Sequence, residues 1–124
     1  MKRDIEDGDL FGLLEAFYAK LEEDPLLAPY FIMVDMADHM PRIVAFWSTI
    51  LFRTGRYRDN AFAPHQRMPG LTADHFSRWV ATLESAVDER FRGIVAEQMK
   101  ATAHRIAYSM QLRLDIAPFA PYRP

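Results

Sequence analysis

Histidines are the side chains of this sequence best suited to hold a metal ion, because a neutral imidazole is the commonest metal ligand in proteins. No two of them stand four residues apart, which is the spacing that places a pair on one helix face in a zinc site. The sequence therefore does not predict a zinc centre. The four histidines are His39, His65, His75 and His104.

The sequence lacks the common signatures of several other kinds of catalytic or binding site. There is no cysteine, which excludes disulfides, thiolate metal sites and cysteine nucleophiles. There is no Gly-x-Ser-x-Gly motif of a hydrolase, and the five glycines are too dispersed to cradle a phosphate group. These absences narrow the candidates to binding proteins and cofactor proteins.

Four apolar stripes at helical spacing predict four helices, and no segment alternates as a strand would. Pro41 is expected in the first turn of the second helix, where its missing N–H is tolerated. The third and fourth helices are joined so tightly that they must be antiparallel. The helices are expected to begin after Asp9, near Asp35, after Thr72 and near Ile94.

The periodicity disappears between the second and third helices, at 53–70. These 18 residues, RTGRYRDNAFAPHQRMPG, contain two glycines and two prolines, and no helix face can be drawn through them. Such a long connection in a small domain is typically functional. Taken alone, His65 in this connection would most simply be a solvent-exposed side chain.

The size of the chain fits one domain, 1–124, with loosely ordered tails at 1–8 and 116–124. Its nine Phe, seven Met, five Tyr and two Trp could fill a core or line a cavity for a flat apolar ligand. The net charge of −2 predicts no binding to nucleic acid or to an anionic membrane. We see no signal peptide and no apolar run long enough for a membrane span, so we expect a cytoplasmic protein.

Aromatic and histidine motifs recur in register with a known family. They read FYAKL at 17–21, HMPRIVAFW at 39–47, YRDNAFAPH at 57–65 and HFSRW at 75–79. In this order and spacing, the sequence resembles the truncated haemoglobins of group III from about Leu10 to Met110. One departure is that Asp59 and Ala61 stand where the family often has Gly and Pro after the tyrosine.

The resemblance implies an all-α, two-over-two truncated globin fold around haem b (iron protoporphyrin IX). It implies that His65 is the protein ligand of the iron, and so the metal-binding residue. Tyr18 and Trp79 would donate hydrogen bonds to a ligand on the other face of the haem. Without a cofactor, Tyr18 would be a core-edge residue bonded to a carbonyl group, and Trp79 an ordinary core residue.

The same resemblance assigns four further residues to the haem pocket. His39 would line or gate the pocket, and Ile43, one turn later, would cap the ligand sterically. Phe46 would touch the haem, and His75 would lie near its edge and meet a propionate group. Without a cofactor, His39 would be a surface histidine near a helix start.

The function implied by the resemblance is reversible binding of O₂, NO or other small diatomic ligands, by a monomer or weak dimer. Two donors above the iron favour slow release of O₂, and therefore NO or peroxide chemistry with a reductase over oxygen transport. NO dioxygenase and peroxidase-like activities both stay open. The alternative is a non-haem helical protein-interaction module in which every aromatic residue is part of the core.

Overall fold

The computed structural model describes residues 2–60 and 68–116. This part of the chain is helical and contains no strand, in agreement with the predicted all-α class. The four helices predicted from the apolar stripes correspond to the four α-helices of these described residues. The elements in chain order are the 3-10 helix η1 (Asp7–Asp9), α1 (Leu10–Glu23), the 3-10 helix η2 (Ala28–Phe31), α2 (Met36–Phe52), α4 (Ala73–Arg90) and α5 (Ile94–Arg113).

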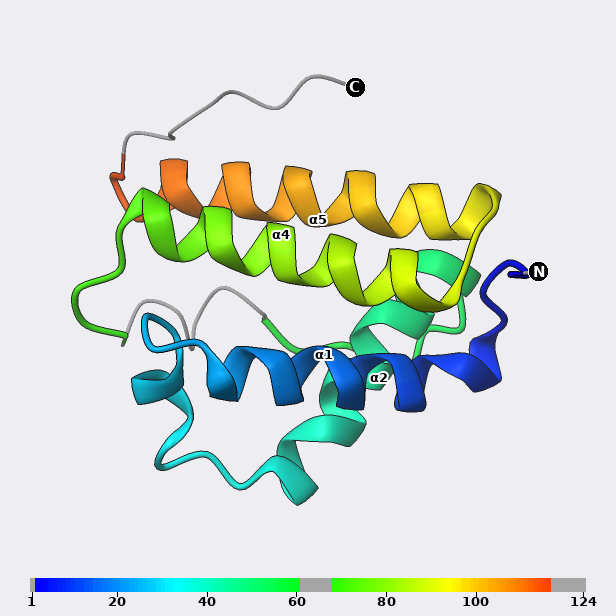
Figure 1. Cartoon of the computed structure of the whole chain (residues 1–124), viewed down its shortest axis with the longest axis horizontal. Helices are drawn as coiled ribbons and strands as arrows, with labels where there is room; N and C mark the ends of the chain where they lie inside the picture. The colour runs from blue at the N-terminus through cyan, green and yellow to red at the C-terminus, as the bar shows by residue number, and fades with distance from the viewer. Residues whose placement is uncertain (1, 61–67, 117–124) are drawn as a thin grey trace.

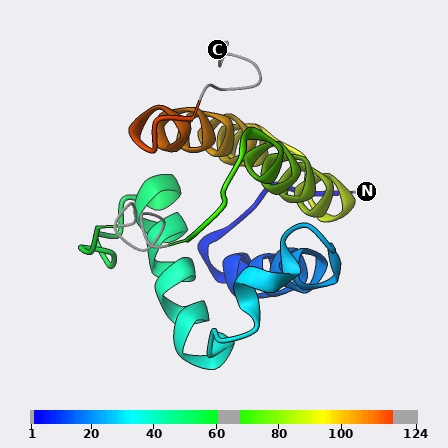
Figure 2. The same cartoon turned by 90° about the vertical axis from the view of Figure 1, so that its left-hand side faces the viewer.

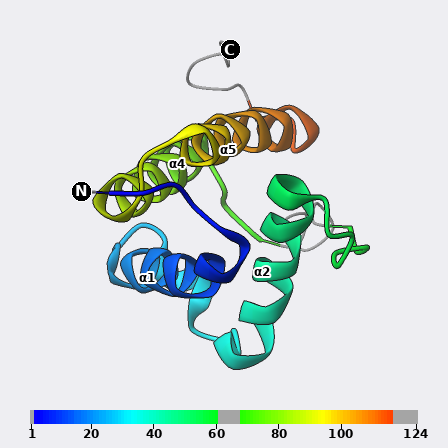
Figure 3. The same cartoon turned by 90° about the vertical axis from the view of Figure 1, so that its right-hand side faces the viewer.

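The four α-helices form two layers (Figure 1). One layer consists of α4 and α5, which lie side by side and antiparallel because only a short turn joins them. The other layer consists of α1 and α2, as Figure 2 and Figure 3 show from the two ends of the molecule. α1 packs against both α2 and α4, so it connects the layers. The predicted two-over-two arrangement is confirmed.

The core of the protein is built around α1, whose apolar stripe faces both neighbouring helices. Burial of each large apolar side chain contributes about 1.5–3 kcal/mol to folding. This stripe therefore supplies a large part of the contact between the layers. Its five residues, each at most 1% exposed, are Leu10, Leu13, Leu14, Phe17 and Leu21.

Helix α2 begins near Asp35, where the sequence predicts its start. The carboxylate of Asp35 accepts a hydrogen bond from the backbone N–H of Ala37 at 3.0 Å, as an N-cap residue does. Because α2 begins at Met36, Pro41 falls in its second turn, so the expectation that Pro41 lies in the first turn is wrong. The cap that was predicted for α4, Thr72, is confirmed.

Residues 2–8 pack against the body of the protein, which corrects the expectation of a loosely ordered N-terminal tail. Ile5 is 3% exposed and belongs to the core. The carboxylate of Asp4 accepts hydrogen bonds from the backbone N–H groups of Val95 and Ala96, at 2.8 and 2.9 Å. The first turn of a helix leaves such N–H groups without intrahelical partners. A residue from the other end of the chain therefore caps α5.

The turn before α5 has the shape that this carboxylate requires. Gly93 has a φ of +148°, which side chains rarely adopt, and a Cβ at this position would overlap the Asp4 side chain. Burial opposes ionisation of Asp4, but the surrounding N–H groups outweigh it and hold the pKa of Asp4 below its ordinary value. Of the other predicted tail, 116–124, all but Ile116 lies outside the described residues.

We expect Asp4→Ala to lower the free energy of unfolding by about 1 kcal/mol at neutral pH, because it removes the cap of α5. The pKa of Asp4 is lowered in the folded state, so its stabilisation is present above the unfolded pKa and is lost as the pH falls through the folded one. Urea unfolding of both proteins between pH 7 and pH ~3 measures this, starting above the unfolded pKa near 4. Glu22→Ala, at an exposed position of α1, is the control. Equal stability losses in the two variants would contradict the assignment.

Candidate functional site

The connection between α2 and α4 has no helix where the structure describes it, at 53–60 and 68–72, in agreement with the sequence. His65, the predicted iron ligand, lies outside the described residues. Its role therefore stays a prediction. The other six predicted site residues are described, and they lie on α1, α2 and α4.

Rings from α1, α2, α4 and η2 form one aromatic cluster. Phe17 and Tyr18 of α1 meet edge to face, with ring centroids 5.0 Å apart. Phe17 contacts Trp79 of α4 at 5.9 Å, and Tyr18 contacts His39 of α2 at 6.3 Å. Phe31 of η2 meets the other side of Tyr18 at 5.8 Å. The fold thus brings Tyr18, His39 and Trp79 together from three helices.

Two hydrogen-bond donors of the aromatic cluster have no partner within the part of the chain that the structure describes. They are the hydroxyl of Tyr18 and the indole N–H of Trp79. Burial raises the pKa of Tyr18 well above its ordinary value, so the hydroxyl keeps its proton and stays a donor. Neither donor is a fully buried atom without a partner; the one found among the described residues is Oε1 of Gln111. A bound molecule that accepts hydrogen bonds would match both donors.

Helix α2 adds an apolar surface beside the aromatic cluster. Ile43 is 7% exposed and belongs to the same core as Phe17. Phe46, three residues later, packs against this core and meets Tyr57 edge to face at 5.2 Å. His39, Ile43 and Phe46 recur at helical spacing on α2, so they lie along one side of it.

Phe46 also lines an open cavity of about 470 Å³ between α2, the residues that follow it and α5. Part of the wall is apolar, and the rest carries hydroxyl, amide and charged groups. A cavity with this mixed lining can take a ligand that is flat and apolar over most of its surface and polar at an edge. The lining residues are Phe46, Tyr57, Asp59, Asn60, Thr102, Arg105, Ile106, Ser109, Met110 and Arg113.

His75 lies apart from the aromatic cluster, at the beginning of α4. Its Nδ1 accepts a hydrogen bond from the backbone N–H of Thr72 at 3.0 Å, within a reciprocal capping box. Its ring meets Tyr30 edge to face at 5.5 Å. Because Nδ1 is the acceptor, Nε2 carries the proton in neutral His75 and is the atom able to donate to a carboxylate. Contact with a propionate stays a prediction.

Two residues next to the site were not identified from the sequence. Phe31 contacts Tyr18, and Tyr30 contacts His75. The sequence marks them only as part of a short apolar segment at 26–31. The spacing within that segment does not show that the adjacent rings of Tyr30 and Phe31 contact different helices.

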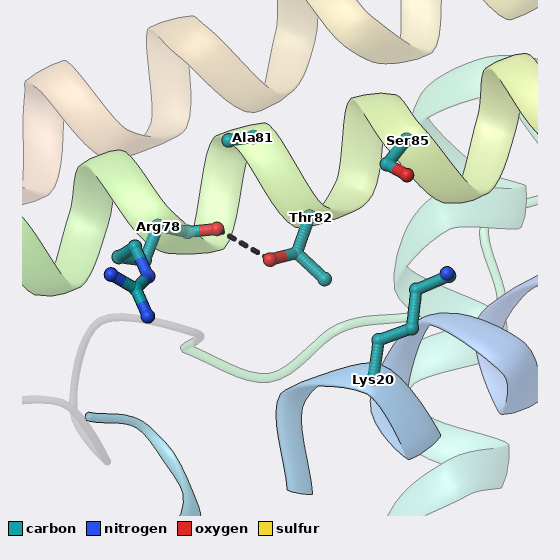
Figure 4. Close-up of a pocket in the computed structure, with 5 residues that line it drawn as sticks. All are labelled: Lys20, Arg78, Ala81, Thr82 and Ser85. Carbon is teal, nitrogen blue, oxygen red and sulfur yellow. Dashed lines mark hydrogen bonds between the residues drawn. The ribbon is translucent and has the colours of Figure 1, made fainter. Parts of the chain in front are cut away.

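A surface pocket of about 320 Å³ lies between α1 and α4, away from the aromatic cluster (Figure 4). Its two cations already have partners: Lys20 pairs with Glu89 at 2.9 Å, and Arg78 pairs with Asp24 at 3.0 Å. The hydroxyl of Thr82 donates to the carbonyl oxygen of Arg78. Both cations of this pocket are therefore already paired with carboxylates.

Two further findings concern the described residues. No group of three or more His, Cys, Asp or Glu side chains among them could hold a metal ion. None of their helices combines the length and the apolar character that crossing a membrane requires.

Two helix pairs stacked in this way, with an aromatic cluster between α1, α2 and α4, define a truncated globin fold. The structure is similar to the crystal structure of group III truncated hemoglobin from Campylobacter jejuni, with a TM-score of 0.82 and 25% sequence identity over 92% of this chain and 95% of that chain. The group 3 truncated hemoglobin of Campylobacter jejuni is 23% identical over 109 residues, which cover 80% of this chain and 86% of that protein. No protein-family model matches the chain. The two similarities to the Campylobacter jejuni truncated hemoglobin confirm the resemblance to group III truncated haemoglobins.

Proposed function

We propose that this protein binds haem b and, through the haem iron, reversibly binds O₂ or another diatomic ligand. The observation that carries the proposal is the pair of donors, Tyr18 and Trp79, that lack a hydrogen-bond partner among the described residues and lie in the aromatic cluster of a truncated globin fold. The names of the similar proteins, both truncated hemoglobins, support the same cofactor. We propose His65 as the iron ligand, on the register of the YRDNAFAPH motif.

The described residues fit this cofactor. Ile43 and Phe46 offer an apolar surface to a flat ring system, and His39 lies beside Tyr18, where it can line the pocket. The Nε2 proton of His75 is available to a carboxylate at the edge of the ring system. When bound, the haem supplies an iron atom that takes diatomic ligands and exchanges electrons.

The task of the chain's own residues is to hold and orient the ligand. The Trp79 N–H can only donate a hydrogen bond and the Tyr18 hydroxyl can donate one, so together they favour a ligand that gains negative charge on binding. A hydrogen bond to a charged group contributes about 1.5–3 kcal/mol, which makes release slow. Slow release suits a reaction of the bound ligand better than delivery. We therefore propose NO or peroxide chemistry, with electrons from a reductase, over oxygen transport.

Titration of the purified protein with haem tests the proposal. We expect one saturable site per chain, with an intense visible absorption band of bound haem whose position changes on reduction and again on adding CO. Bovine serum albumin, which takes up haem without a globin pocket, is the comparison for nonspecific binding. Absence of a saturable, CO-sensitive site would contradict the proposal and favour the helical interaction module.

A further inference from the structure

The segment between η2 and α2 exposes two adjacent apolar side chains. Ile32 is 78% exposed and Met33 is 94% exposed. The segment runs along the edge of the molecule that faces away from α4 and α5 (Figure 1). Methionine is among the residues that are most often fully buried. Met33 departs from this pattern and presents its thioether to solutes.

The backbone fixes this segment as a defined turn. The N–H of Val34 donates a hydrogen bond to the carbonyl oxygen of Phe31 at 3.2 Å. This bond makes Ile32 and Met33 the two central residues of a β-turn, and the φ of −57° and ψ of −39° of Ile32 fit a type I turn. Before the turn, the Phe31 ring packs against the core, and after it Asp35 caps α2. The exposure of Met33 therefore belongs to a turn that is held at both ends.

The other methionines of the described residues have far less contact with solvent. A hydroperoxide has to reach a sulfur atom to react with it, so exposure sets the order in which methionines are oxidised. A polar sulfoxide among apolar side chains would also disrupt the core. Met40, Met99 and Met110 are 7%, 0% and 9% exposed, and Met36 and Met68 are half-buried. Met1 lies outside the described residues.

We propose that Met33 is a redox-modification site: hydroperoxides oxidise its thioether before that of any other described methionine, and the fold stays intact. The sulfur atom attacks one oxygen of the peroxide, so an S–O bond forms and the O–O bond breaks. The proton of the attacked oxygen passes to the leaving oxygen, which becomes water or an alcohol. The sulfur is thereby oxidised to the sulfoxide, and the peroxide is reduced.

The position of Met33 also makes the modification reversible. Methionine sulfoxide reductases return the sulfoxide to the thioether, with a separate enzyme for each epimer, using electrons from thiols and releasing the oxygen as water. Such an enzyme has to enclose the oxidised side chain, which an exposed turn permits and a packed core does not. Each cycle of oxidation and reduction consumes a peroxide molecule. This activity goes beyond the proposed function, because it requires no haem.

The test treats the full-length protein, without added haem, with hydrogen peroxide and follows each methionine by peptide mass spectrometry. We expect the sulfoxide of Met33 to form first, at a rate close to that of free methionine in the same solution. Oxidation of the buried methionines has to wait for an opening of the structure, so it should be at least about tenfold slower.

Two further measurements follow the oxidised protein. The urea midpoint after oxidation of Met33 should equal that of the untreated protein, because an exposed side chain contributes little buried area. Incubation with the two methionine sulfoxide reductases and a dithiol should then restore the thioether.

Met33→Leu and Met36→Leu are matched variants, because each replaces a thioether by a hydrocarbon side chain of similar size near the beginning of α2. With hydrogen peroxide equimolar to the protein, Met33→Leu should lose the fast phase of peroxide consumption. Met36→Leu should keep the fast phase.

The outcomes separate the parts of the proposal. Sulfoxide that forms at Met36 or Met68 as fast as at Met33 would overturn the assignment of the site. A lower urea midpoint after oxidation of Met33 would overturn it as well, because the modification would then be damage to the fold. Resistance of the Met33 sulfoxide to both reductases would make it a lesion that only accumulates. A fast phase that Met33→Leu abolishes and the reductases reverse supports the proposal, whatever the haem titration shows.

Discussion

His65→Ala is expected to fold with an unchanged helix content and to bind haem weakly. Removing a group that only supports a metal ligand typically costs 10–100-fold in affinity, so removing the ligand itself should cost more than about a hundredfold. Added imidazole should restore part of the binding, because it can occupy the position of the missing side chain. Circular dichroism measures the fold, and haem titration with and without imidazole measures the affinity.

His75→Ala is the matched control, because His75 is a half-buried histidine at the beginning of α4, where the connection ends. It should lose the capping box of α4, at a cost of about 1 kcal/mol in stability, and keep histidine-ligated haem. His104→Ala, which removes an exposed side chain paired with Glu84 at 3.4 Å, should behave as the wild type. If His65→Ala kept full haem with an unchanged ferrous spectrum while His75→Ala lost it, the assignment of His65 as ligand would be wrong.

Tyr18→Phe and Trp79→Phe are expected to release O₂ faster by roughly tenfold to a hundredfold each, since each removes one donor to the bound ligand. The ring of Tyr18 would still fill its place between His39 and Phe31, so the change acts on the hydroxyl alone. Trp79→Phe also removes ring volume from the contact with Phe17, so its stability must be measured in parallel. Flash photolysis or stopped-flow mixing measures the release rates.

Tyr108→Phe, which removes a hydroxyl without a hydrogen bond within the described residues, is the control, with no expected change in O₂ release. Unchanged rates in both Tyr18→Phe and Trp79→Phe would show that the aromatic cluster does not face the ligand. Fast O₂ release already in the wild type, together with no repeated turnover of NO when a reductase is supplied, would favour a carrier or sensor over ligand chemistry.

The sequence by itself determined the elements of this fold, because helix signals are local. The apolar stripe of α1, the helix start near Asp35 and the cap Thr72 involve residues within a few positions of one another, and the structure places them as predicted. The lack of a helix at the described ends of the connection, 53–60 and 68–72, was also readable, since Gly and Pro interrupt the periodicity there. The one error within a helix, the position of Pro41, concerns a boundary, where local signals are weakest.

The candidate site was predictable only through the register of several motifs with a known family. Spacing along α1 places Phe17 on the apolar stripe, and Phe17 is fully buried, but spacing does not decide what Tyr18 faces. The structure shows that Tyr18 turns toward His39. Tyr18 and Trp79 have no hydrogen-bond partner among the described residues. This likewise depends on all the residues packed around them, which the sequence alone does not identify.

Contacts between distant parts of the chain were decided by the tertiary structure alone. Asp4 caps α5 across more than ninety residues of sequence. The charged residues next to Asp4 in the sequence are instead typical of a solvent-exposed tail. Tyr30 reaches the carbonyl of Pro69, a group that every residue possesses and that no sequence pattern marks. Such bonds form because packing of the helices has already brought their partners within reach, so their physical cause lies in the assembled fold and not in any local segment.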